Sequence, residues 1–422
     1  MGDTKQATTR PPFAVVSIVF SMGLMAVGNG HLFAYVPVRL AAGGFEPWIA
    51  SAMVAALGVG SCVGCVVAGY VVRRVGPARA YAAFSAMVIL GILMIALAVN
   101  PYLWIASRLV YGVSAAGFFI VTQSWLNDAS PNEWRGRVIG AFYMIYVIGI
   151  GIGGYILRFV DLESADAPLV SIFFTAAGML PICLTRLPAP PPPASIAIAF
   201  RAVWNISPVG IVGMLAVGGL TMLVQGFTPI YVANEGYSQA DVGLLVLLMQ
   251  FGMIGVQFPL GALSDRVDRR YVLLLACLII IISAWIASGL NLADFWFVAL
   301  IFAIWAGASE GIYSVANAHA NDRAEPQYYV SLSSTMLITW SVSGAIFPGI
   351  GTILTSTFGP TAYIDMVIVI AILYALFVLF RITRRESVPS DETVNHQQIS
   401  AQAPYPAELS PQLDDDVRSQ HD

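Results

Sequence analysis

The chain has 422 residues, of which 58% are hydrophobic and only 10% are charged, and its net charge is −4. Soluble domains carry roughly 25% charged residues, so most of this surface cannot face water. The composition therefore excludes a soluble globular protein and indicates an integral membrane protein.

Twelve apolar segments follow one another along the chain, each close to the ~20 residues that a bilayer core requires. They are continuously apolar rather than alternating, which favours helices over barrel strands because a helix satisfies its own backbone hydrogen bonds in lipid. We predict an all-α membrane protein with twelve transmembrane helices. The predicted spans are residues 13–38, 48–72, 80–99, 102–127, 137–160, 168–187, 208–233, 241–263, 271–290, 295–320, 328–356 and 360–382.

The two halves of the chain are diverged copies of one another. A short cationic segment that begins at Gly69 returns at Gly261, and the same offset pairs Gly60 with Gly252. We therefore predict two pseudo-symmetric six-helix bundles. The predicted boundaries are an N-terminal tail at 1–12, bundles at 13–187 and 208–382, a Pro-rich connector at 188–207, and a disordered tail at 383–422.

The basic residues gather on alternate loops, which predicts the orientation. With the N-terminus in the cytoplasm, nearly all of them lie inside; only Arg39 and Arg158 come near the outer ends, and Arg108 falls within a span. The positive-inside rule then predicts that both termini of this multi-pass membrane protein lie in the cytoplasm.

The second cationic segment carries a recognisable motif. Gly261-x-x-x-Asp265-Arg266-x-x-Arg269-Arg270 resembles the loop motif between helices eight and nine of major facilitator superfamily transporters. The first copy keeps the spacing but has Arg73 where that family usually has Asp.

Two further stretches strengthen this resemblance. Arg108-x-x-x-Gly112 is similar to the fourth-helix motif of the superfamily, and Glu133-x-Arg135-Gly-Arg137 resembles the loop that follows it. The string that begins at Gln123 is most similar to the bacterial branch of YcaD type. The resemblance implies six plus six helices and alternating access, and it names no substrate.

The motif residues are candidates for a cytoplasmic gate that closes and opens as the halves rock. An acid at a helix end can pair with Arg and accept bonds from a helix N-terminus, and Asp265 with Arg266 is the favoured pair. Alternatively, the arginines only fix topology. The gate candidates are Arg73, Arg74, Glu133, Arg135, Arg137, Asp265, Arg266 and Arg269.

Arg108 is the most informative residue within a span, because a cation costs about 2.5–3.5 kcal/mol at a helix centre. It either faces a polar cavity, where it attracts an anionic solute or tunes a proton site, or extends to the outer headgroups. Depth along the helices brings Asn29, His31 and Gln225 to a similar level. The remaining cavity candidates are Tyr35, Gln123, Trp305 and Asn317.

The sequence leaves two alternative roles open for each of two titratable residues. His31 is either a proton carrier or a satisfied packing residue. Glu310 lies deeper, about 13 Å below Arg108 by helix rise, so a direct pair between them is not expected. Glu310 is either a proton-coupling carboxylate or a structural hydrogen-bonding group.

Together these features predict a secondary transporter for a small organic solute, with coupling to protons as an option. No P-loop, metal-ligand cluster, catalytic constellation or basic tract is found in the sequence, so we expect no cofactor, metal, nucleotide or nucleic acid and no enzyme activity. The alternative is a membrane sensor or assembly partner that does not transport.

Overall fold

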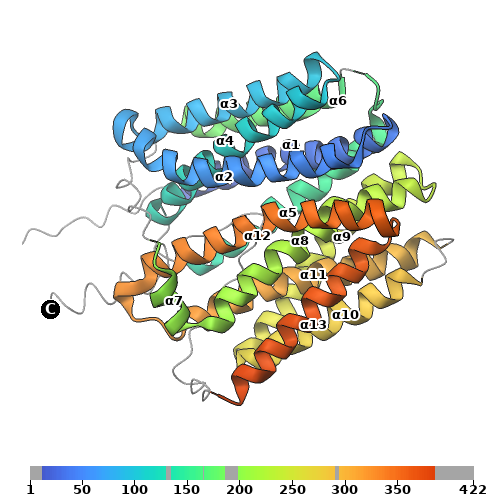
Figure 1. The fold of residues 1–422 in the computed structure, drawn as a ribbon. Helices are drawn as coiled ribbons and strands as arrows, with labels where there is room; N and C mark the ends of the chain where they lie inside the picture. Colours follow the sequence, from blue (N-terminus) through green and yellow to red (C-terminus); the bar gives the residue numbers. More distant parts are fainter. Residues whose placement is uncertain (1–11, 130–134, 165, 186–197, 290–293, 385–422) are drawn as a thin grey trace, which may run out of the picture.

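The computed structural model describes residues 12–129, 135–164, 166–185, 198–289 and 294–384. Within those ranges all regular structure is helical, and twelve helices are long and apolar enough to cross a membrane (Figure 1), as the sequence predicts. The first half contains α1 (Pro12–Ala42), α2 (Pro47–Val75), α3 (Pro77–Leu97), α4 (Pro101–Ala129), α5 (Arg135–Ile156), η1 (Leu157–Phe159) and α6 (Asp166–Leu184). The second half contains α7 (Phe200–Ile206), α8 (Pro208–Asn234), α9 (Gln239–Ser264), α10 (Arg269–Ser288), α11 (Phe295–Asn321), η2 (Pro326–Tyr328), α12 (Tyr329–Phe358) and α13 (Ala362–Ile382).

Proline and short polar side chains set where the helices begin. Pro47, Pro77 and Pro208 stand in the first turns of their helices, where a missing backbone N–H costs nothing. Ser238 caps α9 by a reciprocal capping box, and the carboxylate of Asp294 accepts two backbone N–H bonds at the start of α11. These local signals fix where these helices begin.

The duplication is visible in the packing. In the first half α1 packs on α5 and α6, α2 on α4, and α3 on α4 and α6. The second half repeats each pair, with α8 to α13 in the places of α1 to α6. Thus α8 packs on α12 and α13, α9 on α11, and α10 on α11 and α13. Between the halves, α2 lies against α12 and α5 lies against α9 (Figure 1). The repeat matches α2 with α9 and α5 with α12, so these two contacts are equivalent.

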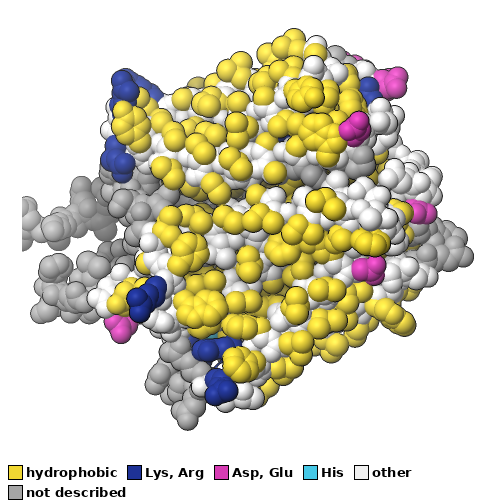
Figure 2. Space-filling model, viewed as in Figure 1, with side chains coloured by type: hydrophobic (Ala, Val, Ile, Leu, Met, Phe, Trp, Pro, Cys, Tyr) yellow, Lys and Arg dark blue, Asp and Glu magenta, His cyan; other side chains and the backbone are white. Residues whose placement is uncertain are grey.

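The two ends of the bundle differ in charge. The end that holds the α2–α3 and α9–α10 loops carries Arg73, Arg74, Arg266 and Arg270, and we call it the basic end. Figure 2 shows dark blue side chains gathered at this end, on the left, with a largely hydrophobic surface over the helices between the ends. That surface is what a bilayer core requires.

Glycine permits the closest helix contacts. A Cβ on Gly60 of α2 would overlap the carbonyl oxygen of Leu109, and one on the matching Gly252 of α9 would overlap that of Ala303. Both halves therefore use glycine at the same repeat position to bring two backbones together. Membrane helices gain packing in this way, since lipid supplies no hydrophobic force between them.

Gly153 of α5 provides a test of this packing. A Cβ there would overlap the carbonyl oxygen of Val27 on α1, so Gly153→Ala forces the two helices apart. We expect a loss of about 1–3 kcal/mol in the free energy of unfolding, measured as a lower thermal midpoint of the purified protein. Gly140→Ala on the same helix is the control, because nothing lies within 4 Å of its Cβ position. An unchanged midpoint for Gly153→Ala would show that α1 and α5 are not in backbone contact.

Candidate functional site

A cavity of about 180 Å³ lies between the two halves, near the middle of the bundle. Its walls come from α1, α2, α4 and α5 of the first half and from α8 and α12 of the second half. Most of the lining is apolar, with Phe33, Leu57 and Phe119 among the larger groups. A space shared by both halves is where a solute can be reached from either side as the halves move.

A polar cluster on the first-half wall joins three helices. The Tyr111 hydroxyl of α4 donates to Asn29 Oδ1 of α1 at 2.5 Å, and Asn29 Nδ2 donates to the Tyr146 hydroxyl of α5 at 3.1 Å. All three residues line the cavity. The mutual bonds fix the orientation of the Asn29 amide and hold the two tyrosine rings against the cavity.

Arg108 lies beside this cluster, one turn before Tyr111 on α4. It is only 6% exposed, and its guanidinium carbon lies 5.6 Å from the centre of the Tyr111 ring. One nitrogen donates to the Leu32 carbonyl oxygen at a long 3.4 Å. Arg108 also lines a second cavity of about 80 Å³, which shares Phe33 and Leu57 with the first. The side chain therefore faces the central space and does not extend to the headgroups.

The amides predicted from sequence are divided between the two walls. Gln123 of α4 lines the cavity from the first half, and Gln225 of α8 lines it from the second. Tyr146 of α5 and Trp340 of α12 also line the cavity, and neither is among the predicted site residues. Their aromatic character was the available signal, but ordinary packing residues give the same signal in an apolar helix.

Besides Glu310, four other candidates lie outside the lining of these two cavities. Both ring nitrogens of His31 contact backbone carbonyl oxygens, Nδ1 that of Gly153 at 3.3 Å and Nε2 that of Ala167 at 2.9 Å. This places His31 in the packing of α1 against α5 and α6. Tyr35 stacks on His31, and Trp305 stacks between Phe302 and Tyr363. Asn317 donates to the Tyr313 carbonyl oxygen in its own helix.

Glu310 of α11 is fully buried and belongs to a separate polar group. Its carboxylate is within electrostatic reach of the hydroxyls of Tyr143 and Tyr313. The Tyr143 hydroxyl of α5 donates to Gln257 Oε1 of α9. This hydrogen bond crosses from one half to the other, so a buried acid lies next to a contact between the halves.

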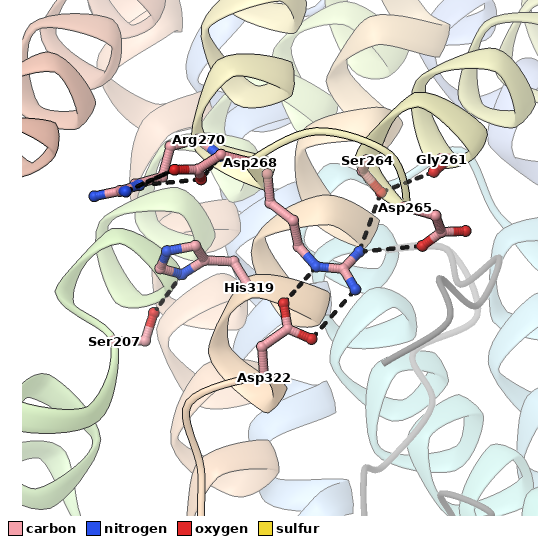
Figure 3. Close-up of polar contacts among 9 residues, drawn as sticks. Ser207, Gly261, Ser264, Asp265, Asp268, Arg270, His319 and Asp322 are labelled. Atoms are coloured by element: carbon pink, nitrogen blue, oxygen red, sulfur yellow. Dashed lines mark hydrogen bonds and ion pairs between the residues drawn. The ribbon is translucent and has the colours of Figure 1, made fainter. Parts of the chain in front are cut away.

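A second polar cluster, at the basic end, is built around Arg269 (Figure 3). Its guanidinium binds both carboxylate oxygens of Asp322, with Nε to Oδ2 at 2.5 Å and Nη2 to Oδ1 at 3.2 Å. Nη1 lies 3.1 Å from Ser264 Oγ and 3.6 Å from an Asp265 oxygen. Arg269 and Asp322 are only 2% and 4% exposed, and they join α10 to the end of α11. Asp265 therefore lies against Arg269, while Arg266 is exposed.

Asp268 and Arg270 form a neighbouring ion pair in the α9–α10 turn, with Arg270 Nη2 at 2.6 Å from Asp268 Oδ2. Burial opposes the charged carboxylate, but hydrogen bonds from the Arg270 side chain and backbone outweigh it and hold the pKa of Asp268 below its usual value. The carboxylate also caps α10. The turn is therefore fixed on both sides of Arg269.

The first-half gate candidates lack such a cluster among the residues that the structure describes. Arg73, Arg74 and Arg137 are exposed, and the Arg73 guanidinium lies back along its own helix near Gly69. Glu133 and the Arg135 side chain lie outside the described part, as do residues 188–197 of the predicted connector and tail residues 385–422.

Comparison with known proteins decides the family. The sequence model of the Major Facilitator Superfamily matches residues 3–154 and 209–410. The chain belongs to the major facilitator superfamily. It is 26% identical over 375 residues to the uncharacterised MFS-type transporter YcaD of Shigella flexneri and of Escherichia coli, covering 88% of this chain and 96% of each relative. The predicted likeness to the YcaD type is confirmed.

Solved structures show the same major facilitator fold. The nucleoside transporter NupG superposes with a TM-score of 0.71 at 12% identity, over 88% of this chain and all of NupG. A bacterial homologue of the human lysosomal transporter Spinster superposes with a TM-score of 0.68 at 13% identity, over 94% of this chain and all of the homologue. Homologues in this superfamily are transporters, so the chain is a multi-pass membrane transporter by family.

The Arg269 cluster yields a stability prediction. Arg269→Ala leaves the buried Asp322 carboxylate without its guanidinium, and we expect a loss of about 3–5 kcal/mol in the free energy of unfolding. Arg266→Ala, at the exposed arginine three residues earlier, is the matched control and stays within about 0.5 kcal/mol. The measurement is thermal unfolding of the purified variants followed by tryptophan fluorescence.

The double variant separates the pair from general damage. Adding Asp322→Ala to Arg269→Ala removes the stranded charge, so the combined loss is smaller than the sum of the single losses. Additive losses would contradict the pairing.

Proposed function

We propose that this chain moves a small organic solute across the bacterial cytoplasmic membrane by alternating access, with proton coupling through Glu310. The observation that carries the proposal is the central cavity, because both repeated halves contribute polar groups to it. Asn29, Tyr111 and Gln123 belong to the first half, whereas Gln225 and Trp340 belong to the second. A relative rotation of the halves changes this site on both sides at once.

Contacts between the halves at the end opposite the basic end support a two-gate arrangement. The Gln239 side chain at the start of α9 donates to the carbonyl oxygens of Leu157 and Val160, next to η1 of the first half. Nearby, a Cβ on Gly243 would lie 2.9 Å from the Gly154 carbonyl oxygen, so α5 and α9 meet closely. Opening toward this end requires these contacts to break.

The basic-end cluster supplies the opposite gate in this proposal. Arg269 holds α10 to α11 through Asp322, while Asp265 keeps a weaker, more exposed contact with the same guanidinium. The exposed contact is the one that a moving first half can replace at low cost, since exposed pairs contribute about 0–1 kcal/mol. Asp265 is therefore the switching member, and Asp322 is the anchor.

In this proposal, Glu310 links proton binding to the movement of the halves. A carboxylate in an apolar interior favours its neutral form, and burial in lipid strengthens this preference. Because Tyr143 both bonds Gln257 across the interface and lies within electrostatic reach of Glu310, a change of charge on Glu310 acts on the contact between the halves. Proton binding and rocking are thereby linked.

Transport in proteoliposomes tests this proposal. The wild type should accumulate at least one solute of a broad panel under an imposed pH gradient. Glu310→Gln should abolish accumulation, because it cannot release a proton, yet keep exchange of labelled for unlabelled solute. Asp365→Asn is the matched control, since Asp365 is an exposed carboxylate at the start of the last helix, and it should transport normally. Full accumulation by Glu310→Gln would remove the coupling role.

The orientation is tested separately with reporter fusions. Because the arginines gather at the basic end, we propose that this end and both termini face the cytoplasm. Green fluorescent protein fused to the C-terminus should then fluoresce, and alkaline phosphatase fused there should be inactive. Phosphatase fused after Gly359, between α12 and α13, should be active. The reverse pattern would invert the topology.

A further inference from the structure

We propose that the central site recognises a small monocarboxylate with a single ring, whose carboxylate binds Arg108 and whose ring occupies the cavity beside Tyr111. This inference rests on the proposed transport function and specifies the class of solute. Three properties carry it: an arginine without an acidic partner, an otherwise uncharged lining, and a small space with aromatic walls.

The first property is the pairing of Arg108. A guanidinium has five N–H donors and stays charged at every physiological pH. In the described part of the chain, Arg108 makes one long hydrogen bond, to the Leu32 carbonyl oxygen, and lies over the Tyr111 ring. Buried charges in proteins are normally paired. Arg269, equally buried, shows the normal case in this same chain, with a bidentate carboxylate and a serine.

The second property is the charge of the lining. Among the described residues that line the two adjoining cavities, Arg108 is the only Asp, Glu, Lys, Arg or His. The site therefore carries one uncompensated positive charge. A monoanion neutralises it, whereas a cation is repelled and a dianion leaves an excess negative charge in an apolar space. A carboxylate matches the planar guanidinium fork by two parallel hydrogen bonds.

The third property is size and shape. Cavities of about 180 Å³ and 80 Å³ adjoin at Phe33 and Leu57. A cavity of about 150 Å³ holds one benzene ring, so the larger space accepts one ring and the smaller one accepts the carboxylate near Arg108. Tyr111, Phe119, Tyr146 and Trp340 supply aromatic faces and edges. Rings pack against such walls by offset or edge-on contacts.

Trp340 adds a specific polar contact. Its indole Nε1 is buried and has no hydrogen-bond partner among the described residues, although the residue lines the cavity. The indole N–H can only donate. A hydroxyl or second acceptor on the ring would satisfy it, which extends the class to ring acids with one such substituent.

The test compares an acid with its neutral isostere. Titration calorimetry on the purified, full-length protein measures binding of benzoate and of benzamide, which share a ring and differ in charge. We expect wild type to prefer benzoate at least about tenfold, as a charge-assisted hydrogen bond implies. Acetate should bind weakly because it leaves the cavity empty, and 1-naphthoate should bind weakly because its second ring does not fit.

Variants assign the preference to Arg108. In Arg108→Gln the ratio of the two dissociation constants should fall to about one, and in Arg108→Lys it should be intermediate, because Lys keeps the charge but not the fork. Arg158→Gln is the matched control. Arg158 also lies over a tyrosine ring, that of Tyr155, but outside the cavity lining, so its variant should keep the wild-type ratio. If Arg108→Gln fails to fold, the isostere comparison on wild type still decides.

The outcomes separate this inference from the transport proposal. Equal binding of benzoate and benzamide to wild type, an unchanged ratio in Arg108→Gln, or no binding of any ring acid would overturn the inference. If neutral or cationic solutes are then accumulated in proteoliposomes, transport stands and only the solute class fails. If ring acids bind with the expected preference but no solute crosses the membrane, the carboxylate site stands and the transport proposal fails.

Discussion

A charge buried in the protein interior must be neutralised, and this requirement organises the polar structure of the chain. The interior offers neither water nor counterions, so each buried ionisable side chain needs a partner from the protein or from a ligand. Arg269 meets the requirement within the fold through Asp322, and that pair ties α10 to α11. Arg108 meets it only in part, through a carbonyl oxygen and a ring face. Arg108 and Arg269 are both buried, but only Arg269 has an acidic side chain beside it, and the two arginines therefore differ in role.

The same requirement shows how the halves have diverged. By the repeat, Arg73 occupies the position of Asp265 and Pro77 that of Arg269. The first half therefore lacks both members of the Asp265–Arg269 pair, while the glycine contacts are present in both halves at Gly60 and Gly252. Backbone packing is needed to hold six helices together in either copy, whereas the proposed gate needs its polar switch in one copy only.

Sequence alone predicted the helices, the duplication and part of the site. Span length and motif spacing are strong signals because the bilayer fixes both. The face that each helix turns to the cavity was harder to predict, because lipid and the protein interior are equally apolar and the sequence therefore shows little periodicity. Asn29 and His31 illustrate this limit. Two residues rotate a helix by about 200°, so Asn29 faces the cavity whereas His31 packs against α5 and α6. Asp322 was missed because its partner is 53 positions away in sequence.

The separation of Arg108 from Glu310 bears on how coupling could operate. Arg108 lies seven residues into α4 and Glu310 fifteen residues into α11, both counted from the end opposite the basic end, so they differ in depth by more than two helical turns. A solute at Arg108 therefore need not displace the proton on Glu310. In the proposed mechanism, coupling then runs through the halves themselves, because the Tyr143–Gln257 hydrogen bond joins α5 to α9 and a solute in the cavity would contact both halves. Each ligand favours one arrangement of the same interface, and linkage requires no contact between them.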